Sequence, residues 1–337
     1  MTPNDALRLL QAEILQVVGC TEPAAIAYAF RTLARHLPKK PTPDSFRAEL
    51  RLSRDAFRNA STAAVPRLDT IGILAAAAAG LASRSATFNV FADFDLRRAR
   101  AFMKNPAWLR ILPVRRRGLF VHARLPGLRT EVILQGRHDH IERLLVSGED
   151  LTPREQPLPP PPSLDEIFAL ARARDPRLEA LARDFLLRQV PAEKGFPPDT
   201  QIARRVAGRM AGYAHPVMTI TGSGNQGIFI GLPYRRLYAE QGDAILPAVV
   251  FSLLAQVHLS AKKKRLSAAC GLATKAAPAL AAGLAFAQGA SPADVRRLLR
   301  DLPARLAPLP CEGAEPACGQ KARRVFRALR ATFPLLA

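Results

Sequence analysis

The feature that most constrains the fold is a proline-rich segment at residues 158–162, which contains four consecutive prolines. Such a segment is extended and interrupts a helix, so it predicts a boundary between two parts of the chain. Before it, several stretches alternate apolar and polar residues as strands do; after it, helical spacing dominates. With 337 residues, the chain can form one large domain or two of ordinary size. We therefore predict an α+β fold, in which a mainly helical domain is joined to a smaller α+β domain with an antiparallel sheet.

Strand-like alternation occurs at residues 46–52, 87–94, 119–124, 130–135 and 141–147. The last three stretches predict a small antiparallel meander, with Gly127 and Gly136 at its turns. Helical periodicity predicts helices at residues 5–18, 21–36, 71–82, 165–189, 199–213, 243–259, 268–288, 292–302 and 321–332. We predict three parts: N-terminal helices at 1–40 that pack on the helical domain, the α+β domain at 44–155, and the helical domain at 163–337.

Three of the four cysteines, Cys270, Cys311 and Cys318, lie in the last quarter of the chain beside glycine or proline. Two thiolates on one loop and a third from an earlier helix end can hold three corners of an iron-sulfur cluster, which leaves one iron without a protein ligand. Zinc is a competitor, although structural zinc favours closer cysteine pairs and four closed ligands. Alternatively, these cysteines are buried small hydrophobic residues. The spacing from Cys311 to Cys318 matches no stock metal motif, so spacing alone leaves all three interpretations open.

The fourth cysteine, Cys20, lies in the string Gly-Cys-Thr-Glu-Pro between two predicted helices. Thr21 can cap the second helix, and Pro23 suits its first turn. At a helix N-terminus, the dipole and the free N–H groups stabilise a thiolate. The alternative is a structural thiol in the elbow between the two helices, and the residues alone do not decide between them.

Residues 222–227 read Gly-Ser-Gly-Asn-Gln-Gly. Three glycines in six residues allow N–H groups to converge on an anion, and Ser223, Asn225 and Gln226 add polar contacts. The segment is not a Walker loop, because no Lys-Ser/Thr follows, nor a dinucleotide fingerprint, because no strand with a ribose-binding acid accompanies it. On its own it indicates an anion site at a helix start and nothing more specific.

His138 and His140 flank Asp139 and could be read as metal ligands. Histidines two residues apart face the same side only in an extended segment. A turn with a hydrogen-bonded imidazole is the commoner arrangement, so we predict a turn here.

A formal net charge of +21 is typical of proteins that bind nucleic acids or anionic surfaces. Here, however, arginines are dispersed through almost every predicted helix, and aromatic residues are not interleaved with the basic ones. We therefore expect no nucleic-acid partner. No apolar run is long enough to cross a bilayer, and four cysteines in a long chain argue against a disulfide framework. We expect a cytoplasmic protein without membrane contact, whose thiols stay reduced and available to a metal.

Taken together, these motifs resemble the L-cysteine desulfidase family, which belongs with the iron-sulfur-dependent L-serine dehydratases of the alpha-chain type. The most specific strings are Gly-Cys-Thr-Glu-Pro at 19–23 and Gly-Ser-Gly-Asn-Gln-Gly at 222–227, in this order and with all four cysteines accounted for. The resemblance also includes Arg58-Asn59 with Pro66, residues 138–141, Arg209-Met210, residues 216–219, residues 265–268 with Cys270-Gly271, and residues 311–314 with Cys318 and Lys321.

The resemblance implies that Cys270, Cys311 and Cys318 hold a [4Fe-4S] cluster and that Cys20 is the catalytic base. It also implies a substrate site lined by Glu22, Asn59, Ser223, Gly224, Asn225 and Gln226. The implied reaction is β-elimination from a small β-substituted L-amino acid, in the first place L-cysteine, which yields sulfide, ammonia and pyruvate. L-Serine dehydration by the same mechanism is the alternative. As partners we expect this small amino acid and allow for a homodimer.

Several residues depart from the family pattern. Ile220 stands where the family usually has Asn, Arg67 where it has Gly, and Glu315 where it has Lys. These differences motivate a further hypothesis, a catalytically divergent relative that keeps the fold and the cluster as a binding or sensing module. The sequence leaves open which β-substituted amino acid is used.

Overall fold

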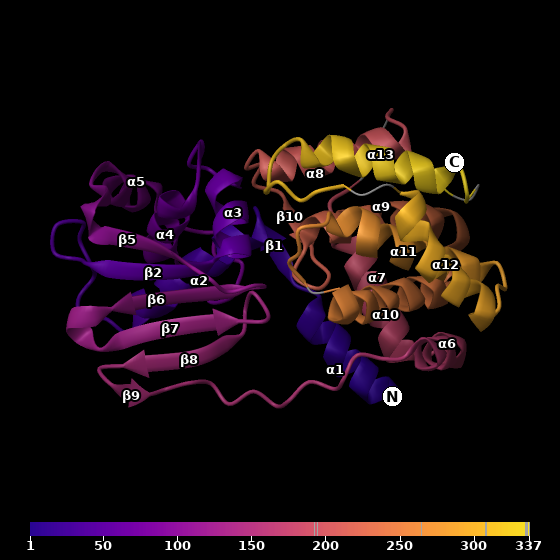
Figure 1. Cartoon of the computed structure of the whole chain (residues 1–337), viewed down its shortest axis with the longest axis horizontal. Coiled ribbons are helices and arrows are strands. Elements are labelled where there is room, and N and C mark those ends of the chain that lie inside the picture. Colours follow the sequence, from indigo (N-terminus) through magenta and orange to yellow (C-terminus); the bar gives the residue numbers. More distant parts are fainter. Residues whose placement is uncertain (192, 194, 264, 307–308, 334–335, 337) are drawn as a thin grey trace.

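A computed structural model describes the chain except for residues 192, 194, 264, 307–308, 334–335 and 337. Figure 1 shows a sheet with short helices on the left and a group of helices on the right. We call these the sheet half, formed by residues 19–150, and the helical half, formed by residues 1–18 and 164–336. The predicted α+β fold is confirmed.

The main sheet has six strands in the order β5-β2-β6-β7-β8-β9. The bounds are β2 (Ala48–Ser53), β5 (Leu109–Val114), β6 (Phe120–Leu125), β7 (Thr130–Gln135), β8 (Ile141–Val146) and β9 (Glu149–Asp150). Strands β6, β7 and β8 form the predicted antiparallel meander. Strand β5, which the sequence did not predict, runs parallel to β2, so the sheet is mixed rather than antiparallel. Parallel neighbours need a crossover connection, and the helices between β2 and β5 supply it.

The helices of the sheet half are α2 (Thr21–Arg35), α3 (Arg54–Thr62), α4 (Ile73–Ala82) and α5 (Leu96–Lys104). A short hairpin, β3 (Ala64–Val65) with β4 (Thr70–Ile71), connects α3 to α4. Helix α2 packs on β6 and β7 and against α4. The contact with α4 is close, because a Cβ at Gly80 would lie 2.3 Å from the carbonyl oxygen of Ala27. This packing fixes α2, whose first turn faces the helical half.

The helices of the helical half are α1 (Pro3–Glu13), α6 (Leu164–Ala173), α7 (Pro176–Leu187), α8 (Pro198–Met210), α9 (Gly224–Gln241), α10 (Leu246–Lys263), α11 (Ala277–Ala287), α12 (Pro292–Arg305) and α13 (Cys318–Arg330). Helix α10 is central and contacts α6, α7 and α11. The stretch Gly224–Lys263, which contains α9 and α10, is long and apolar enough to cross a membrane, contrary to our expectation from the sequence. In the fold, 78% of its apolar window is buried, as in the core helix of a globular protein.

Three predicted elements are wrong in detail. The helix expected at 5–18 ends at Glu13, because the chain becomes extended at Ile14 and then forms a strand. The strand expected at 87–94 is a series of turns that buries apolar side chains without a sheet partner along its length. The helix expected at 165–189 is broken at Arg174, which has a left-handed backbone (φ 52°), and Pro176 then starts α7.

The two N-terminal helices separate, although both were expected to pack on the helical domain. Helix α1 contacts α7 and α10, whereas α2 packs on the sheet. Gly19 makes this change of direction possible: its φ of +76° is a conformation that favours glycine, and a Cβ there would lie 2.7 Å from the Pro66 ring. The domain limits at 44–155 and 163–337 stay a prediction.

A short antiparallel strand pair joins the segment before α2 to the segment before α9. Strand β1 (Gln16–Val18) pairs with β10 (Pro216–Met218), and the Thr219 amide donates to the Leu15 carbonyl at 2.7 Å. Cys20 lies two residues after the end of β1, and the glycine-rich segment begins four residues after the end of β10. The pair therefore brings Cys20 close to residues 222–227.

Helices α8 and α13 pack closely along their length, and this contact positions Cys318. Gly319 is the second residue of α13, where a Cβ would lie 2.5 Å from the Ala203 carbonyl oxygen on α8. Asp199 reinforces the contact by accepting hydrogen bonds from Arg323 and Arg327 at 2.9 and 2.8 Å.

We predict that Gly319→Ala destabilises the protein by about 1–3 kcal/mol, because the new methyl group has to push α13 away from α8. Alanine has the higher helix propensity, so propensity alone predicts the opposite sign. Denaturant unfolding measures the change. Gly127→Ala is the control, since nothing lies within 4 Å of its added Cβ, and we expect it to change stability by less than about 0.5 kcal/mol. A stabilising Gly319→Ala substitution would contradict the close contact.

Candidate active site

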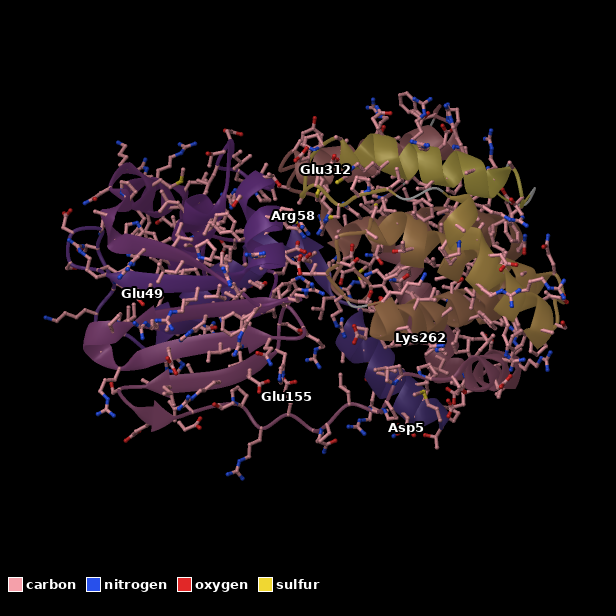
Figure 2. All side chains as sticks on the ribbon, in the orientation of Figure 1. Asp5, Glu49, Arg58, Glu155, Lys262 and Glu312 are labelled. Atoms are coloured by element: carbon pink, nitrogen blue, oxygen red, sulfur yellow. The ribbon has the colours of Figure 1, made fainter. Side chains whose placement is uncertain are left out.

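A pocket of about 110 Å³ lies where the two halves meet. Its walls combine residues of both halves: Cys20, Glu22, Asn59, His138, Arg209, Ser223, Asn225, Gln226, Arg265, Cys270, Lys275, Cys311 and Cys318. We call residues 311–318 the cysteine loop. It meets α3 where the Ala314 amide donates to Thr62 Oγ1 at 3.0 Å, and in Figure 2 the labelled Arg58 and Glu312 lie on the two sides of this junction. The residues that line the pocket come from seven separate stretches of the sequence.

Cys20 is the N-cap residue of α2 and is 3% exposed. Its thiol donates to Glu22 Oε2 at 3.1 Å. Thr21, which we expected to cap the helix, is instead the first helical residue, and its hydroxyl donates to the same carboxylate oxygen at 3.2 Å. Glu22 thus stabilises the first turn of α2 by accepting hydrogen bonds from the two residues that precede it.

The backbone at the start of α2 favours a Cys20 thiolate, as the helix N-terminus predicts, but other effects outweigh it. Burial raises the pKa of Cys20 well above its ordinary value, and the neighbouring Glu22 carboxylate raises it further. Arg209 acts in the opposite direction but does not compensate. Cys20 is therefore a protonated thiol at neutral pH.

The buried carboxylate of Glu22 accepts hydrogen bonds from several side chains. The Asn59 amide donates to Glu22 Oε1 at 3.1 Å, and His138 Nε2 lies 3.7 Å from the same oxygen. Burial alone would raise the pKa of Glu22, but His138, Cys20 and Asn59 together hold it well below its usual range. Glu22 is therefore ionised at neutral pH and carries the negative charge on this side of the pocket.

His138 lies in the predicted turn, between β7 and β8, but its imidazole belongs to the site and lacks, among the described residues, the hydrogen bond that we expected. It is 2% exposed, lines the pocket, and neither ring nitrogen has a hydrogen-bond partner within the described part of the chain. Gly222 lies against it, since a Cβ there would be 2.4 Å from His138 Nδ1. His140, by contrast, is outside the pocket and hydrogen bonds to Glu155 at 3.0 Å.

The glycine-rich segment forms the turn into α9, as predicted. Ser223 caps the helix by accepting the Gln226 amide at 3.3 Å, so its hydroxyl supports the fold as well as lining the pocket. Asn225 accepts from Arg209 Nη1 at 3.0 Å. Gln226 accepts from Gln256, whose amide also donates to a threonine and a serine in a buried polar network. Gly224 starts the helix but is not among the residues that line the pocket.

The three late cysteines lie on one wall of the pocket, and each is only partly exposed. The Cys270 amide donates to the Leu309 carbonyl at 2.8 Å, which fixes the helix end bearing Cys270 next to the chain leading into the cysteine loop. Burial raises the pKa of Cys270 and of Cys318, and the neighbouring thiols raise both further. The charge of one thiolate would therefore oppose ionisation of its neighbours.

Two lysines, Lys275 and Lys321, lie near the wall of the pocket that carries the three late cysteines. Lys321 lowers the pKa of Cys270 and Cys318 against the larger effect of burial. Lys275 is 1% exposed, donates to the Arg265 carbonyl at 2.7 Å, and has a pKa lowered to about 8, mainly by burial. Three thiols beside cations are a donor set that fits thiolate ligation of iron. Across the described residues, no three His, Cys, Asp or Glu side chains converge on the position of a single metal ion; cluster cysteines bind different irons and do not need to.

The structure thus brings together Cys20, Glu22, Asn59, Ser223, Asn225, Gln226 and the three late cysteines in one pocket, with Gly224 just behind it. Their roles stay predictions. Sequence reasoning missed His138, Arg209 and Lys275 as pocket residues. A signal existed for the first two, because both lie in strings that carry the family resemblance.

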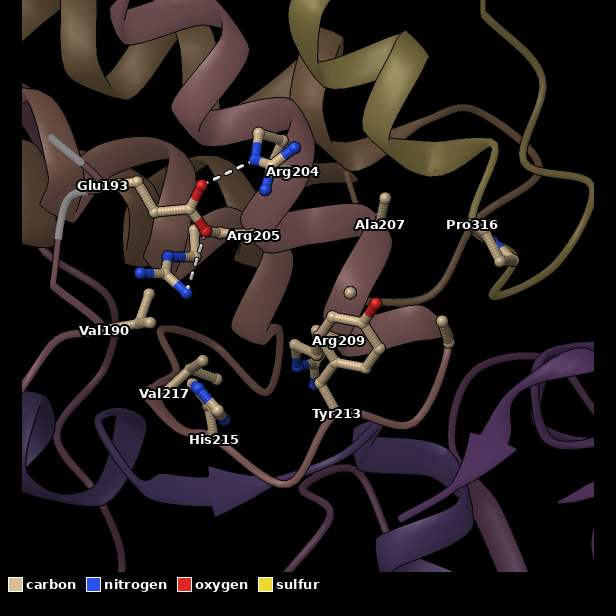
Figure 3. A pocket seen from close by; sticks show the side chains of 12 residues that line it. Val190, Glu193, Arg204, Arg205, Ala207, Arg209, Tyr213, His215, Val217 and Pro316 are labelled. Atoms are coloured by element: carbon tan, nitrogen blue, oxygen red, sulfur yellow. Dashed lines mark hydrogen bonds and ion pairs between the residues drawn. The ribbon is translucent and has the colours of Figure 1, made fainter. Parts of the chain in front are cut away.

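A larger cavity of about 480 Å³ adjoins this pocket, and Arg209 lines both (Figure 3). It holds Tyr213 and His215 but none of the four cysteines. We therefore place the candidate active site in the smaller pocket.

A sequence model of the serine dehydratase alpha chain matches residues 172–331, which include Arg209, the glycine-rich turn and the three late cysteines. The resemblance to the serine dehydratase alpha-chain family is confirmed. The matched residues form most of the helical half.

Similar proteins extend the resemblance into the sheet half. A UPF0597 protein of Oleidesulfovibrio alaskensis is 28% identical over 359 residues, covering 93% of this chain and 83% of the relative. A UPF0597 protein of Caldanaerobacter subterraneus is 25% identical over 360 residues, with the same coverage of 93% and 83%. A third, from Clostridium botulinum, is 26% identical over 366 residues, covering 94% and 82%. No solved structure is significantly similar to the chain.

We predict that Glu22→Gln lowers the pKa of Cys20, because the substitution removes the negative charge that opposes thiolate formation. The thiolate fraction at a given pH near 8 should rise by about tenfold or more, since one pKa unit corresponds to a tenfold change. The measurement is the rate of Cys20 alkylation against pH in the cluster-free protein, read from the Cys20 peptide by mass spectrometry. Glu155→Gln, remote from the pocket, is the control. An unchanged or higher midpoint for Glu22→Gln would contradict the assigned coupling.

Proposed function

We propose that the protein is an iron-sulfur-dependent β-eliminating lyase that acts on a small β-substituted L-amino acid, and we favour L-cysteine. One observation carries the proposal: all four cysteines of the chain, from regions far apart in the sequence, line a single pocket. One buried thiol and three partly buried thiols line this space together with polar and charged side chains. The match to the serine dehydratase alpha-chain model supports a lyase.

Cys270, Cys311 and Cys318 would hold a [4Fe-4S] cluster, and Lys275 and Lys321 would balance the charge of its thiolates. When bound, the cluster supplies a Lewis-acidic iron that stabilises the negative charge on the departing β-substituent. The protein's own side chains would remove the α-proton and position the substrate.

Cys20 is the proposed base for the substrate's α-proton. Its raised pKa makes its thiolate a strong base once formed, but the thiol must first lose its proton. Glu22 and His138 provide a path: the thiol donates to Glu22, and His138 lies on the carboxylate's other oxygen. Abstraction of the α-proton then leaves an electron pair that forms the Cα–Cβ double bond, and the Cβ–S bond breaks as sulfide departs. The enamine product hydrolyses with water to pyruvate and ammonia.

L-Serine is the second candidate, favoured by the match to the serine dehydratase alpha chain. With serine the departing group is hydroxide rather than sulfide, and the roles of Cys20 and the late cysteines are unchanged. In either case the proposed partner is a small amino acid. A cytoplasmic location and a homodimer complete the proposal.

We predict that the anaerobically reconstituted protein releases sulfide and pyruvate from L-cysteine, or pyruvate from L-serine. Cys20→Ala should retain its iron but lose about 10²–10⁴-fold in kcat, the usual contribution of a general base. Cys318→Ser should lose iron and activity together, because it removes a cluster ligand. Assays of released sulfide and pyruvate, with iron content measured on the same samples, separate the two effects.

D-Cysteine is the substrate control, because a base on one side of the pocket abstracts the α-proton of one enantiomer. Turnover that survives in Cys318→Ser would contradict the proposal. A wild-type protein that holds a cluster but turns over neither L-cysteine nor L-serine would favour the divergent binding or sensing module instead.

A further inference from the structure

Arg209 is a buried arginine of the pocket whose charge no carboxylate among the described residues balances. It is 4% exposed at the end of α8, and its Nη1 donates to Asn225 Oδ1 at 3.0 Å. Its Nε and Nη2 atoms have no hydrogen-bond partner among the residues that the structure describes. A guanidinium buried with two unpaired nitrogens is unfavourable unless a ligand pairs with them.

Two neighbouring arginines on the same helix form ion pairs with a carboxylate, in contrast to Arg209. Arg204 Nε and Arg205 Nη1 form ion pairs with Glu193 at 2.6 and 3.2 Å, as the dashed lines in Figure 3 show. Within the described residues, Arg209 forms no ion pair with Asp or Glu. The Glu22 carboxylate in the same pocket is already occupied by Cys20, Thr21 and Asn59. Among the described residues, an acid therefore pairs with Arg204 and Arg205 but none pairs with Arg209.

A second positive feature, the start of α9, lies beside Arg209 just behind the pocket wall. Helix α9 begins at Gly224, and a Cβ at Gly224 would lie 2.5 Å from Arg209 Nε. The guanidinium thus lies against the first turn of α9, where the helix dipole is positive, although Ser223 already accepts the Gln226 amide there. Two positive groups side by side, without an anion between them, are the arrangement expected of a carboxylate-binding site.

We propose that Arg209, together with the N-terminus of α9, binds the α-carboxylate of the amino-acid substrate. The inference rests on the proposed function and specifies it: the pocket selects compounds with an α-carboxylate. Arg209 and Asn225 then hold one end of the substrate, Cys20 faces its α-carbon, and the side chain extends toward Cys270, Cys311 and Cys318. Planar guanidinium groups pair with carboxylates through two parallel hydrogen bonds, which also fixes the orientation of the substrate.

A competing role for Arg209 is electrostatic support of Cys20. Its positive charge acts against the burial that raises the pKa of Cys20. That role requires no ligand and no free carboxylate. The two roles differ in what a substitution changes: substrate affinity in the first, and the titration of Cys20 in the second.

The test uses the reconstituted protein with L-alanine as the probe, since L-alanine has the α-carboxylate and no β leaving group. Calorimetric titration should show that Arg209→Gln weakens L-alanine binding by tenfold or more. Arg209→Lys, which keeps a charge without the planar fork, should bind with intermediate affinity. Ethylamine, which lacks the carboxylate, should bind wild type and variants alike. With L-cysteine as substrate, KM should rise by at least tenfold in Arg209→Gln, and kcat should fall less.

Arg205→Gln is the matched control, because it removes an arginine from the same helix that does not line the smaller pocket. It should bind L-alanine as the wild type does.

Equal L-alanine affinity in wild type and Arg209→Gln would overturn the inference, as would a wild type that does not bind L-alanine. A shifted Cys20 alkylation midpoint in Arg209→Gln with unchanged affinity would also overturn it. Arg209-dependent L-alanine binding in a protein without turnover would uphold the carboxylate site and refute the lyase.

Discussion

The site depends on one short strand pair. Strand β1 ends two residues before Cys20, and β10 ends just before the glycine-rich turn, so their antiparallel pairing sets the positions of both. Hydrogen bonds between Leu15 and Thr219 in both directions, at 2.7 and 3.2 Å, and from the Thr221 amide to the Glu13 carbonyl at 3.0 Å extend the junction. Without this pair, Cys20 would belong to the sheet half alone and the three late cysteines to the helical half alone.

Buried charge is the second determinant of the pocket. Glu22, Arg209 and Lys275 are each less than 10% exposed within one small region, although burial of unpaired charge is costly. Glu22 is stabilised by donors from three segments, and Lys275 by the carbonyl of Arg265, which is itself paired with Glu13. Arrangements of this kind are unfavourable for stability alone and are typical of sites that bind or transform a charged ligand. Stability elsewhere comes from the apolar contacts around α10 and between α2 and α4.

The α+β class, the meander β6–β8 and most helices were predictable, because binary patterns are local. Strand β5 was not, since its parallel partner β2 is far away in sequence and its own residues at 109–114 mix proline and arginine with apolar residues. In the site, Cys20, Asn59 and the late cysteines were found through strings that resemble a family. The place of His138 in the pocket was not predictable because Glu22, which lies 3.7 Å from its Nε2, is distant in sequence, and the raised pKa of Cys20 required knowledge of its burial. Local motifs indicate candidate residues; charge states depend on packing that only the fold reveals.

The central claim is that three thiols on one wall of the pocket hold an iron-sulfur cluster opposite Cys20. The most direct measurement is the iron and acid-labile sulfide content of the anaerobically reconstituted chain, together with its visible absorption spectrum. The account predicts about four irons and four sulfides per chain with broad absorption typical of thiolate-bound clusters. A chain that stays colourless and iron-free, or that takes up one zinc ion in place of iron and sulfide, would contradict it.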